Sequence, residues 1–290
     1  MFLSAALDDY LHTLPLKRGE IRSEQVAFNF SDIRPANRFF KPMVRELRFD
    51  VSEMAIVTYV QAKAHGKPLV LLPATVMGRF QHGTLLCNAA RPLTPADLPG
   101  KRVGVRSYSQ TTAVWVRGIL AEQYGVDMDA LHWVTFEDGH VGEYREPASV
   151  QRASSDKNLL DMLRQGELDA AIYGADLPQD PALVSVIANP ETAAQAWYAK
   201  HGVVPINHMV VTTQALAQSR PDLVVEIYRL LAQAKRAAGL PKPGQIDFLP
   251  FGLAACRPAL QTIVNYALQQ NLIPQEIDVD ALFDDTTRNL

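Results

Sequence analysis

The sequence predicts a two-lobed α/β fold, in which each lobe is a mostly parallel sheet flanked by helices and two crossing strands form the hinge. A chain of 290 residues corresponds to about two domains at roughly 150 residues each. Short apolar runs alternate with helical patterns, which is typical of parallel sheets covered by helices. Two apolar runs that each begin with a histidine, His82–Leu86 and His208–Thr212, indicate that the chain crosses between the lobes twice.

The first 75 residues alternate strands with helices. Strands are identified by short apolar runs with period two, and helices by longer patterns that end at a glycine. The expected elements are strands at Phe2–Leu7 and Gln25–Phe30 around a turn at Gly19, a helix at Arg38–Leu47, a strand at Phe49–Met54 that ends in a polar loop, a helix at Thr58–His65 and a buried strand at Leu69–Pro73.

A second alternating series follows a proline-rich stretch, and the rest of the chain is helical. The expected elements are strands at Thr84–Asn88, Val103–Val105, Trp133–Phe136 and Ala170–Tyr173, a helix at Thr111–Tyr124 closed by Gly125, and two helices with apolar residues spaced three and four apart at Leu223–Ala234 and Leu260–Leu268. We therefore assign residues 1–83 and 205–290 to a discontinuous first lobe and residues 84–204 to the second lobe.

Composition excludes several classes of function. With 48% hydrophobic and 20% charged residues, the chain can bury a sizeable core. Its net charge of −3 leaves no basic excess for a nucleic-acid backbone, so we expect no nucleic-acid partner. No glycine-rich loop of the nucleotide-binding kind occurs. Cys87 and Cys256 lack the CxxC spacing of zinc and redox sites, and we expect buried free thiols.

The sequence gives no sign of a membrane segment or a targeting signal. No apolar run reaches about 18 residues, so we expect no membrane span. The first residues have no basic region and no convincing cleavage site, which predicts a cytoplasmic location. A leader removed upstream of Met1 would make the location periplasmic instead.

One loop is the best candidate for ligand binding. In an open two-lobed sheet, ligands lie beyond the carboxyl ends of the strands and between the lobes. The loop at residues 106–112 joins the end of a strand to the start of a helix, where free N–H groups and the helix dipole attract a carboxylate. Its candidate contacts are Arg106, Tyr108, Ser109, Gln110, Thr111 and Thr112. The alternative is that Ser109 or Thr111 only caps the helix.

Four further residues are candidates for proton transfer and substrate binding. His82 and His208 each lead a crossing strand, and histidine exchanges a proton most readily near neutral pH. Each is alternatively a hydrogen-bonding residue of the hinge. Glu53 follows a strand and is either a proton acceptor or a partner of the neighbouring backbone. Arg79 either clamps a substrate carboxylate or is a solvated surface arginine.

Two other features carry weaker signals. His140 and Glu143 are three residues apart in an apparent loop, but two ligands without a third make no metal site, so we expect no metal. Trp115 and Tyr173 either form aromatic walls of a ligand site or pack in the core.

The order of five sequence elements resembles that of the 4,5-dihydroxyphthalate decarboxylase family over nearly the whole chain. The elements are FDVSEM at 49–54, DLPGKRVGV at 97–105, WVRGIL at 115–120, YGV at 124–126 and PINH at 205–208. The resemblance implies the fold of type II periplasmic solute-binding proteins, with a ligand cleft between the lobes. The element at 97–105 is shared widely by those binders and is specific for the fold only.

The resemblance implies decarboxylation of an aromatic catechol dicarboxylate in bacterial aromatic degradation, with no organic cofactor because the catechol itself takes up and returns the electrons. Glu53 or one of His82 and His208 would take the phenolic proton, and the other histidine would protonate the ring carbon. Arg79 or Arg106, with the loop at 109–112, would hold the carboxylates. Two departures bear on the cleft: Gln81 stands where the family often has a basic residue, and the region from Phe136 to Asn158 is shorter and different.

Two other functions stay open. The first is a non-catalytic solute-binding protein that captures an aromatic carboxylate or other small anion and passes it to a transporter permease. The second is another enzyme on this fold, such as a relative from pyrimidine-precursor or menaquinone synthesis. The sequence does not decide whether the chain forms a homo-oligomer.

Overall fold

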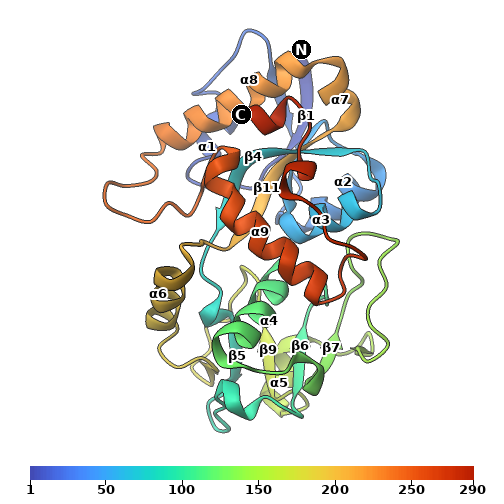
Figure 1. Ribbon diagram of the computed structural model, residues 1–290, viewed down its shortest axis with the longest axis vertical. Coiled ribbons are helices and arrows are strands. Elements are labelled where there is room, and N and C mark those ends of the chain that lie inside the picture. The colour runs from blue at the N-terminus through green and yellow to red at the C-terminus, as the bar shows by residue number, and fades with distance from the viewer.

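The computed structural model describes residues 1–290 and shows two lobes, each built on one sheet (Figure 1). The first sheet has the strand order β2-β1-β3-β11-β4, and the second has the order β10-β5-β9-β6-β7-β8. The strands of the first sheet are β1 (Phe2–Ala6), β2 (Ala27–Phe30), β3 (Val51–Ala55), β4 (Leu69–Gly78) and β11 (Ile206–Thr213). Those of the second are β5 (Leu85–Asn88), β6 (Arg102–Val105), β7 (His132–Thr135), β8 (Gln151–Arg152), β9 (Ala170–Ile172) and β10 (Leu183–Ser185).

Each sheet contains a single strand that opposes all the others. In the first sheet this is β11, which runs antiparallel to both of its neighbours, β3 and β4. In the second it is β5, which runs antiparallel to β9 and β10. Both are the first strand that the chain forms after it arrives from the other lobe. The expectation of a mostly parallel sheet in each lobe is therefore confirmed.

Nine helices cover the sheets (Figure 1). They are α1 (Leu14–Lys17), α2 (Asn37–Glu46), α3 (Ile56–Ala64), α4 (Thr111–Tyr124), α5 (Leu159–Gln165), α6 (Pro190–His201), α7 (Gln214–Ser219), α8 (Pro221–Ala237) and α9 (Leu253–Gln269). Helix α4 has the predicted bounds because Gly125 ends it in the left-handed region, at a φ of 66°. Helix α9 packs against α3 and α4, and therefore connects the two lobes on one side of the molecule.

Two local expectations were wrong. No polar loop separates β3 from α3, because Ala55 is the extended residue before the helix and Ile56 already begins it. Strand β4 does not end at Pro73. Leu72 pairs with Val210 and Thr75 pairs with Met209, so Pro73 and Ala74 lie in a bulge between them. Because a bulged residue makes no ladder hydrogen bond, the strand continues past a proline that has no N–H to donate.

The longer β4 moves the first crossing upstream of the predicted position. The chain leaves the first sheet after β4, which ends at Gly78, and returns to it at β11. The prediction that His82 leads a crossing strand was wrong, since His82 begins a short 3-10 turn, His82–Thr84, before β5, which lies wholly in the second sheet. Cys87 and Cys256 are both buried and free, as predicted. None of the helices combines the length and apolar character needed to cross a membrane.

Candidate functional site

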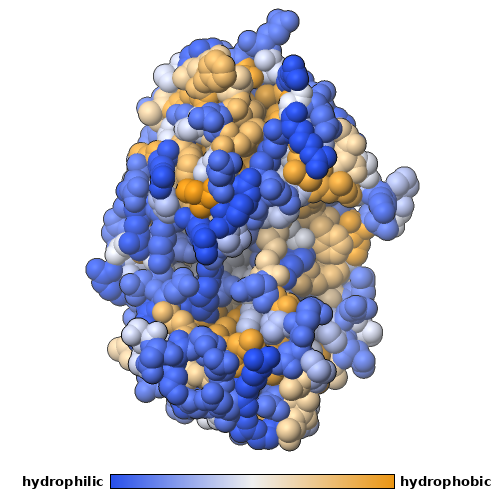
Figure 2. All heavy atoms as spheres, turned by 180° about the vertical axis from the view of Figure 1, so that it is seen from behind, coloured by the Kyte–Doolittle hydropathy of each residue, from blue (hydrophilic) through white to orange (hydrophobic).

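A cavity of about 250 Å³ lies where the two lobes and the two crossing strands meet. Figure 2 shows hydrophilic side chains over most of one face of the molecule, with apolar side chains in several patches on both lobes. Its lining includes Asp8, Tyr10, Phe40, Arg79, Arg106, Gln110, Thr111, Thr112, His140, Asn207 and His208. Both lobes and both crossings therefore contribute to one site.

Glu53, which is buried, and His208, which is partly exposed, form a pair at this cavity. They lie on the adjacent antiparallel strands β3 and β11, where Glu53 is opposite Val210, so that the two long side chains meet diagonally. His208 Nδ1 is 2.6 Å from Glu53 Oε1, and Glu53 is 0% exposed. Because a carboxylate oxygen only accepts, Nδ1 is the donor. Nε2 makes no hydrogen bond within the chain, so this nitrogen is free for a ligand.

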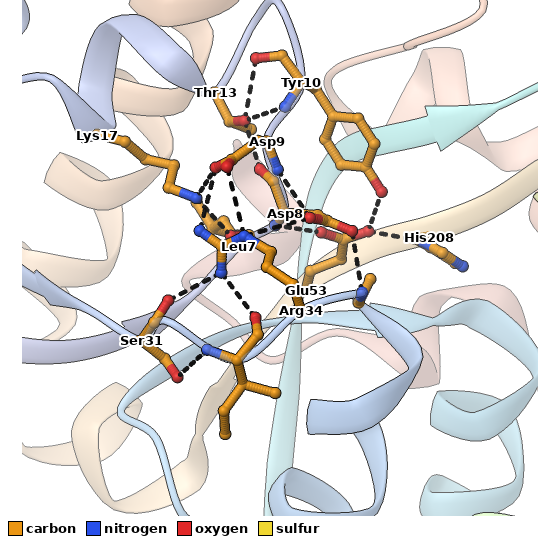
Figure 3. A network of polar contacts seen from close by, with 12 residues as sticks. Leu7, Asp8, Asp9, Tyr10, Thr13, Lys17, Ser31, Arg34, Glu53 and His208 are labelled. Atoms are coloured by element: carbon orange, nitrogen blue, oxygen red, sulfur yellow. Dashed lines mark hydrogen bonds and ion pairs between the residues drawn. The ribbon is translucent and has the colours of Figure 1, made fainter.

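Two groups from the loop after β1 also donate to Glu53 (Figure 3). The Tyr10 hydroxyl donates to Oε1 at 2.7 Å, and the Asp8 backbone N–H donates to Oε2 at 3.0 Å. Burial and the neighbouring Glu53 raise the pKa of Tyr10, which keeps its hydroxyl a donor. The carboxylate therefore accepts three hydrogen bonds and holds the His208 ring in a fixed orientation.

A second histidine, His140, lines the same cavity. Its Nδ1 is 2.7 Å from Thr58 Oγ1, and the Phe40 ring packs edge-on against both histidines, with centroids 5.5 Å from His140 and 5.0 Å from His208. Burial, followed by the nearby Arg106, lowers the pKa of His140 to about 3. The ring is therefore neutral near pH 7, and it offers a hydrogen bond rather than a charge.

The start of α4 offers unpaired donors to the cavity. The N–H groups of Thr111, Thr112 and Ala113 have no acceptor in the chain, and no side chain caps the helix. The alternative that Ser109 or Thr111 caps α4 was therefore wrong; Thr111 Oγ1 instead accepts from the Val57 N–H at 3.3 Å. Free N–H groups at the positive end of a 14-residue helix are a site for an anion.

Two arginines complete this wall. Arg79 donates from Nη2 to the Gly174 carbonyl at 2.6 Å, but its buried Nε has no partner, and burial lowers the pKa of the guanidinium. Arg106 has only a long contact, 4.0 Å, with Glu137. Arg79 and Arg106 therefore both have donor capacity left for a ligand carboxylate.

Two curated relatives are similar to this chain in sequence. The 4,5-dihydroxyphthalate decarboxylase of Comamonas testosteroni is 28% identical over 256 residues, which cover 81% of this chain and 75% of the relative. The 4,5-dihydroxyphthalate decarboxylase of Pseudomonas putida is 31% identical over 210 residues, which cover 68% of this chain and 81% of the relative.

The chain belongs to the 4,5-dihydroxyphthalate decarboxylase family.

No family model matches the chain. The structural neighbours of this member of the decarboxylase family include periplasmic binding proteins. The aliphatic sulphonate-binding protein SsuA of Escherichia coli superposes with a TM-score of 0.62, at 14% identity, over 98% of this chain and 92% of the neighbour. The alkanesulfonate-binding protein SsuA of Xanthomonas axonopodis superposes with a TM-score of 0.58, at 15% identity, over 98% of both chains. At these identities the likeness shows the fold, and it agrees with the predicted two-lobed type II architecture.

The structure brings most of the predicted site residues together. Six of them line the cavity directly: Arg79, Arg106, Gln110, Thr111, Thr112 and His208. Glu53 lies directly behind His208. Tyr173 lines a neighbouring cavity instead, and Tyr108 and Ser109, within the loop, are buried and line neither cavity. Tyr108 packs against the Arg117 guanidinium, 4.0 Å from its ring centroid, which anchors the loop to α4.

His82 lies outside the cavity. Its Nε2 is 3.0 Å from Gln123 Oε1 on α4, and its ring packs edge-on against Trp197 of α6. The preceding residue, Gln81, is buried and donates to both the Arg79 carbonyl and Asn207 Oδ1, which joins the two crossings. Gln81 and His82 therefore make structural contacts next to the cavity and do not line it.

Two of the weaker sequence candidates have structural roles. Trp115 is fully buried in the core and donates from Nε1 to the Ile206 carbonyl at 2.8 Å. Glu143 is paired with Lys67 at 2.6 Å, whereas His140 contacts Thr58, so the two residues of the metal hypothesis have separate partners.

Sequence reasoning missed several cavity residues, including Asp8, Tyr10, His140 as a cavity histidine, and Asn207. Asp8 and Tyr10 follow the end of β1 directly, so the rule that ligands lie beyond strand ends would have selected them. Asn207 precedes His208 on β11 and donates to Thr112 Oγ1 at 3.4 Å. Only His140, in the long connection between β7 and β8, carried no such signal.

Proposed function

We propose that the protein is a cofactor-independent decarboxylase of an aromatic catechol dicarboxylate of the 4,5-dihydroxyphthalate type. One observation carries the proposal: the Glu53–His208 pair faces the same cavity as the unpaired N–H groups of α4, in a chain whose curated relatives are named for this reaction. A group that can deliver a proton and an anion site in one cavity are what the removal of CO2 from a bound aromatic carboxylate requires.

The anion wall would orient the substrate. One carboxylate would accept from the N–H groups of Thr111 and Thr112, and Arg79 or Arg106 would hold a carboxylate through the guanidinium. The substrate ring would then lie against Phe40, between His140 and His208, the two histidines that the Phe40 ring contacts. This orientation presents the ring carbon that bears a carboxylate to a histidine nitrogen.

Decarboxylation would need one proton at the ring carbon. We assign His208 as its carrier, because Glu53 behind it supports the imidazolium form. Electron density from the ring hydroxyl para to that carbon allows the carbon to take the proton from Nε2. The bond to the carboxylate then breaks, its electron pair returns to the ring, and CO2 leaves. His208 regains a proton from solvent, so the net reaction consumes one proton and releases one CO2.

His140 would act on the hydroxyl. As a neutral ring it accepts or donates one hydrogen bond in the cavity, whereas a second imidazolium there would compete with His208. His82 is not given a role, since its ring contacts Gln123 and Trp197 rather than the cavity.

The second candidate function is a receptor that binds an aromatic carboxylate or other small anion without reaction and delivers it to a transporter permease. The fold of the structural neighbours favours it. The two functions imply different locations: we infer the cytoplasm for the decarboxylase, whereas the receptor would act in the periplasm.

The deciding experiment mixes the metal-stripped protein with 4,5-dihydroxyphthalate. CO2 release and protocatechuate formation are followed together, with the heat of binding measured in parallel. Turnover supports the decarboxylase. Binding without turnover supports the receptor. If neither signal is seen, the decarboxylase of this substrate is ruled out, and a receptor would have to bind a different anion.

A further inference from the structure

Asp8 places a carboxylate of the chain itself in the cavity, and neither the anion wall nor the proton transfer uses its side chain. Asp8 follows the end of β1 and lines the cavity, with 20% of its side chain exposed. Its backbone N–H donates to Glu53, which places it beside the Glu53–His208 pair (Figure 3). The two lining arginines, Arg79 and Arg106, belong to the anion wall. The cavity therefore presents cations on one side and a carboxylate on the other.

Backbone donors hold the Asp8 carboxylate, and its only contact with a cation is long. Oδ1 accepts from the Asp9 N–H at 2.9 Å, and Oδ2 accepts from the Ala36 N–H at 2.9 Å. Arg34 Nε is 3.5 Å from Asp8 Oδ1, but Arg34 makes a closer contact, 3.1 Å, with Asp9. Lys17 also pairs with Asp9 (Figure 3). Asp9 therefore balances most of the local positive charge, and the charge of Asp8 is only loosely balanced.

The start of α2 also lines the cavity, through Pro35 and Ala36, but its N–H groups are already paired. Asp8 accepts from the Ala36 N–H. The Arg38 N–H donates to the Pro35 carbonyl at 3.0 Å, and the Phe39 N–H donates to the Ala36 carbonyl at 3.1 Å. At α2 the chain's own carboxylate thus holds the kind of position that α4 leaves to a ligand.

A carboxylate in this position selects between a hydroxyl and a second carboxylate. It accepts hydrogen bonds and donates none, and its two oxygens have about four acceptor positions, of which backbone N–H groups take two in Asp8. A ring hydroxyl can donate to a remaining position. A ring carboxylate there would bring two like charges within a few ångströms of each other. The hydroxyls and carboxylates of a 4,5-dihydroxyphthalate lie at opposite edges of the ring, so they match the two sides of the cavity.

We propose that Asp8 is a specificity-determining residue, which accepts a hydrogen bond from a ring hydroxyl of the substrate and excludes a carboxylate from the first-lobe side of the cavity. This inference rests on the proposed function in one respect, the position of the substrate carboxylate at α4. It deepens that function, because Asp8 then fixes which edge of the ring faces α4.

The test measures equilibrium binding of two pairs of stable ligands by calorimetry. Benzoate and 3,4-dihydroxybenzoate differ only in two hydroxyls. Phthalate and benzene-1,2,4,5-tetracarboxylate differ only in two carboxylates at the corresponding edge of the ring. We expect the native protein to bind 3,4-dihydroxybenzoate about 10- to 100-fold more tightly than benzoate, the range for a hydrogen bond to a charged group. We expect the tetracarboxylate to bind about tenfold more weakly than phthalate, because either of its edges would meet a like charge.

Two substitutions at Asp8 separate its charge from its place in the loop. Asp8→Asn removes the charge and keeps an acceptor oxygen, so the preference for 3,4-dihydroxybenzoate should fall below about fivefold. The tetracarboxylate should then bind within about threefold of phthalate. Asp8→Glu keeps the charge and should keep both preferences in their native direction. The matched control is Asp32→Asn, which removes an exposed carboxylate of the same lobe and should leave both ratios within about twofold of the native values.

Several outcomes overturn the inference. In the native protein these are equal binding of benzoate and 3,4-dihydroxybenzoate, equal binding of phthalate and the tetracarboxylate, and no binding of any of the four ligands. In the variants they are native ratios that persist in Asp8→Asn, loss of both preferences in Asp8→Glu, and an equal change in Asp32→Asn.

CO2 release from 4,5-dihydroxyphthalate by the native protein is measured separately. A protein that releases CO2 but whose binding ratios do not depend on Asp8 loses only this inference and keeps the proposed function. A protein with the expected ratios and no CO2 release loses the decarboxylase function, and Asp8 remains the residue that selects the ligand.

Discussion

The two walls of the cleft differ in how fully their polar groups are paired. On the wall of the first lobe, Glu53 accepts three hydrogen bonds, from Tyr10, Asp8 and His208. Their donor–acceptor distances are 2.7, 3.0 and 2.6 Å. On the wall of the second lobe, the N–H groups at the start of α4 and the amide oxygen of Gln110 have no partner. One wall is complete without a ligand, and the other is not.

This difference separates two tasks. A group that moves a proton needs a fixed tautomer and orientation, which the saturated carboxylate gives to His208. A group that binds an anion needs donors that are free until the anion arrives, since donors already paired within the chain gain little from it. Substitutions on the first wall should therefore lower the rate of reaction, and substitutions on the second should weaken binding.

The largest effect is expected for His208→Asn. Removing the ring nitrogen that faces the cavity should lower kcat about 10²- to 10⁴-fold, the range for positioned proton transfer, with little change in the Kd of phthalate. Steady-state CO2 release and calorimetry measure the two quantities. The control is His132→Asn, an exposed histidine at the start of β7.

His82→Asn tests the pairing of histidines that the sequence suggested. We expect turnover to persist, because the His82 ring contacts Gln123 and Trp197 outside the cavity. Loss of turnover in His82→Asn, with His208→Asn still active, would reverse the roles given to the two residues.

Arg79→Met should have the next largest effect, and on binding rather than rate. A charge-assisted hydrogen bond to a carboxylate contributes enough that we expect the Kd of phthalate to rise about 10- to 100-fold. Arg102→Met, at an exposed arginine at the start of β6, is the matched control. A fall in kcat with an unchanged Kd would show that the second wall does more than bind.

The rule that ligands lie at strand ends predicted much of the anion wall from the sequence, because Arg106 to Thr112 is a local strand-to-helix connection. The Glu53–His208 contact was harder to predict from the sequence. It depends on the register of β3 against β11, two strands that are 155 residues apart at the contacting pair. Glu53 and His208 were candidates one by one, but their contact is a property of the sheet.

The error at His82 has a specific physical origin. Pro73 would ordinarily end a strand, and a strand that ends there puts the next apolar run, with His82 at its head, at the crossing. In the structure a bulge at Pro73 lets β4 continue to Gly78, so the crossing is complete before His82 is reached. Whether a proline ends a strand depends on a partner strand distant in sequence, which local patterns do not report.

The smallest effect concerns His140 and the acid stability of the fold. Its pKa is lowered to about 3 by burial and by nearby cations, of which Arg106 is the strongest, whereas an unfolded histidine has a pKa of about 6.5. Between these values the unfolded chain binds a proton that the native ring does not. Stability therefore falls as the pH falls through this window, by about 1.4 kcal/mol per pH unit for this group alone.

His140→Asn removes that contribution and keeps a side chain that can hydrogen-bond Thr58. We expect the variant to be less stable than the native protein at pH 7 but to lose less of its free energy of unfolding between pH 6.5 and about 4. Urea unfolding at several pH values gives both slopes, and His132→Asn should retain the native slope because that histidine is exposed. Parallel slopes for His140→Asn and the native chain would mean that folding does not lower the pKa of His140, and would remove the assignment of a neutral ring at this position of the cavity.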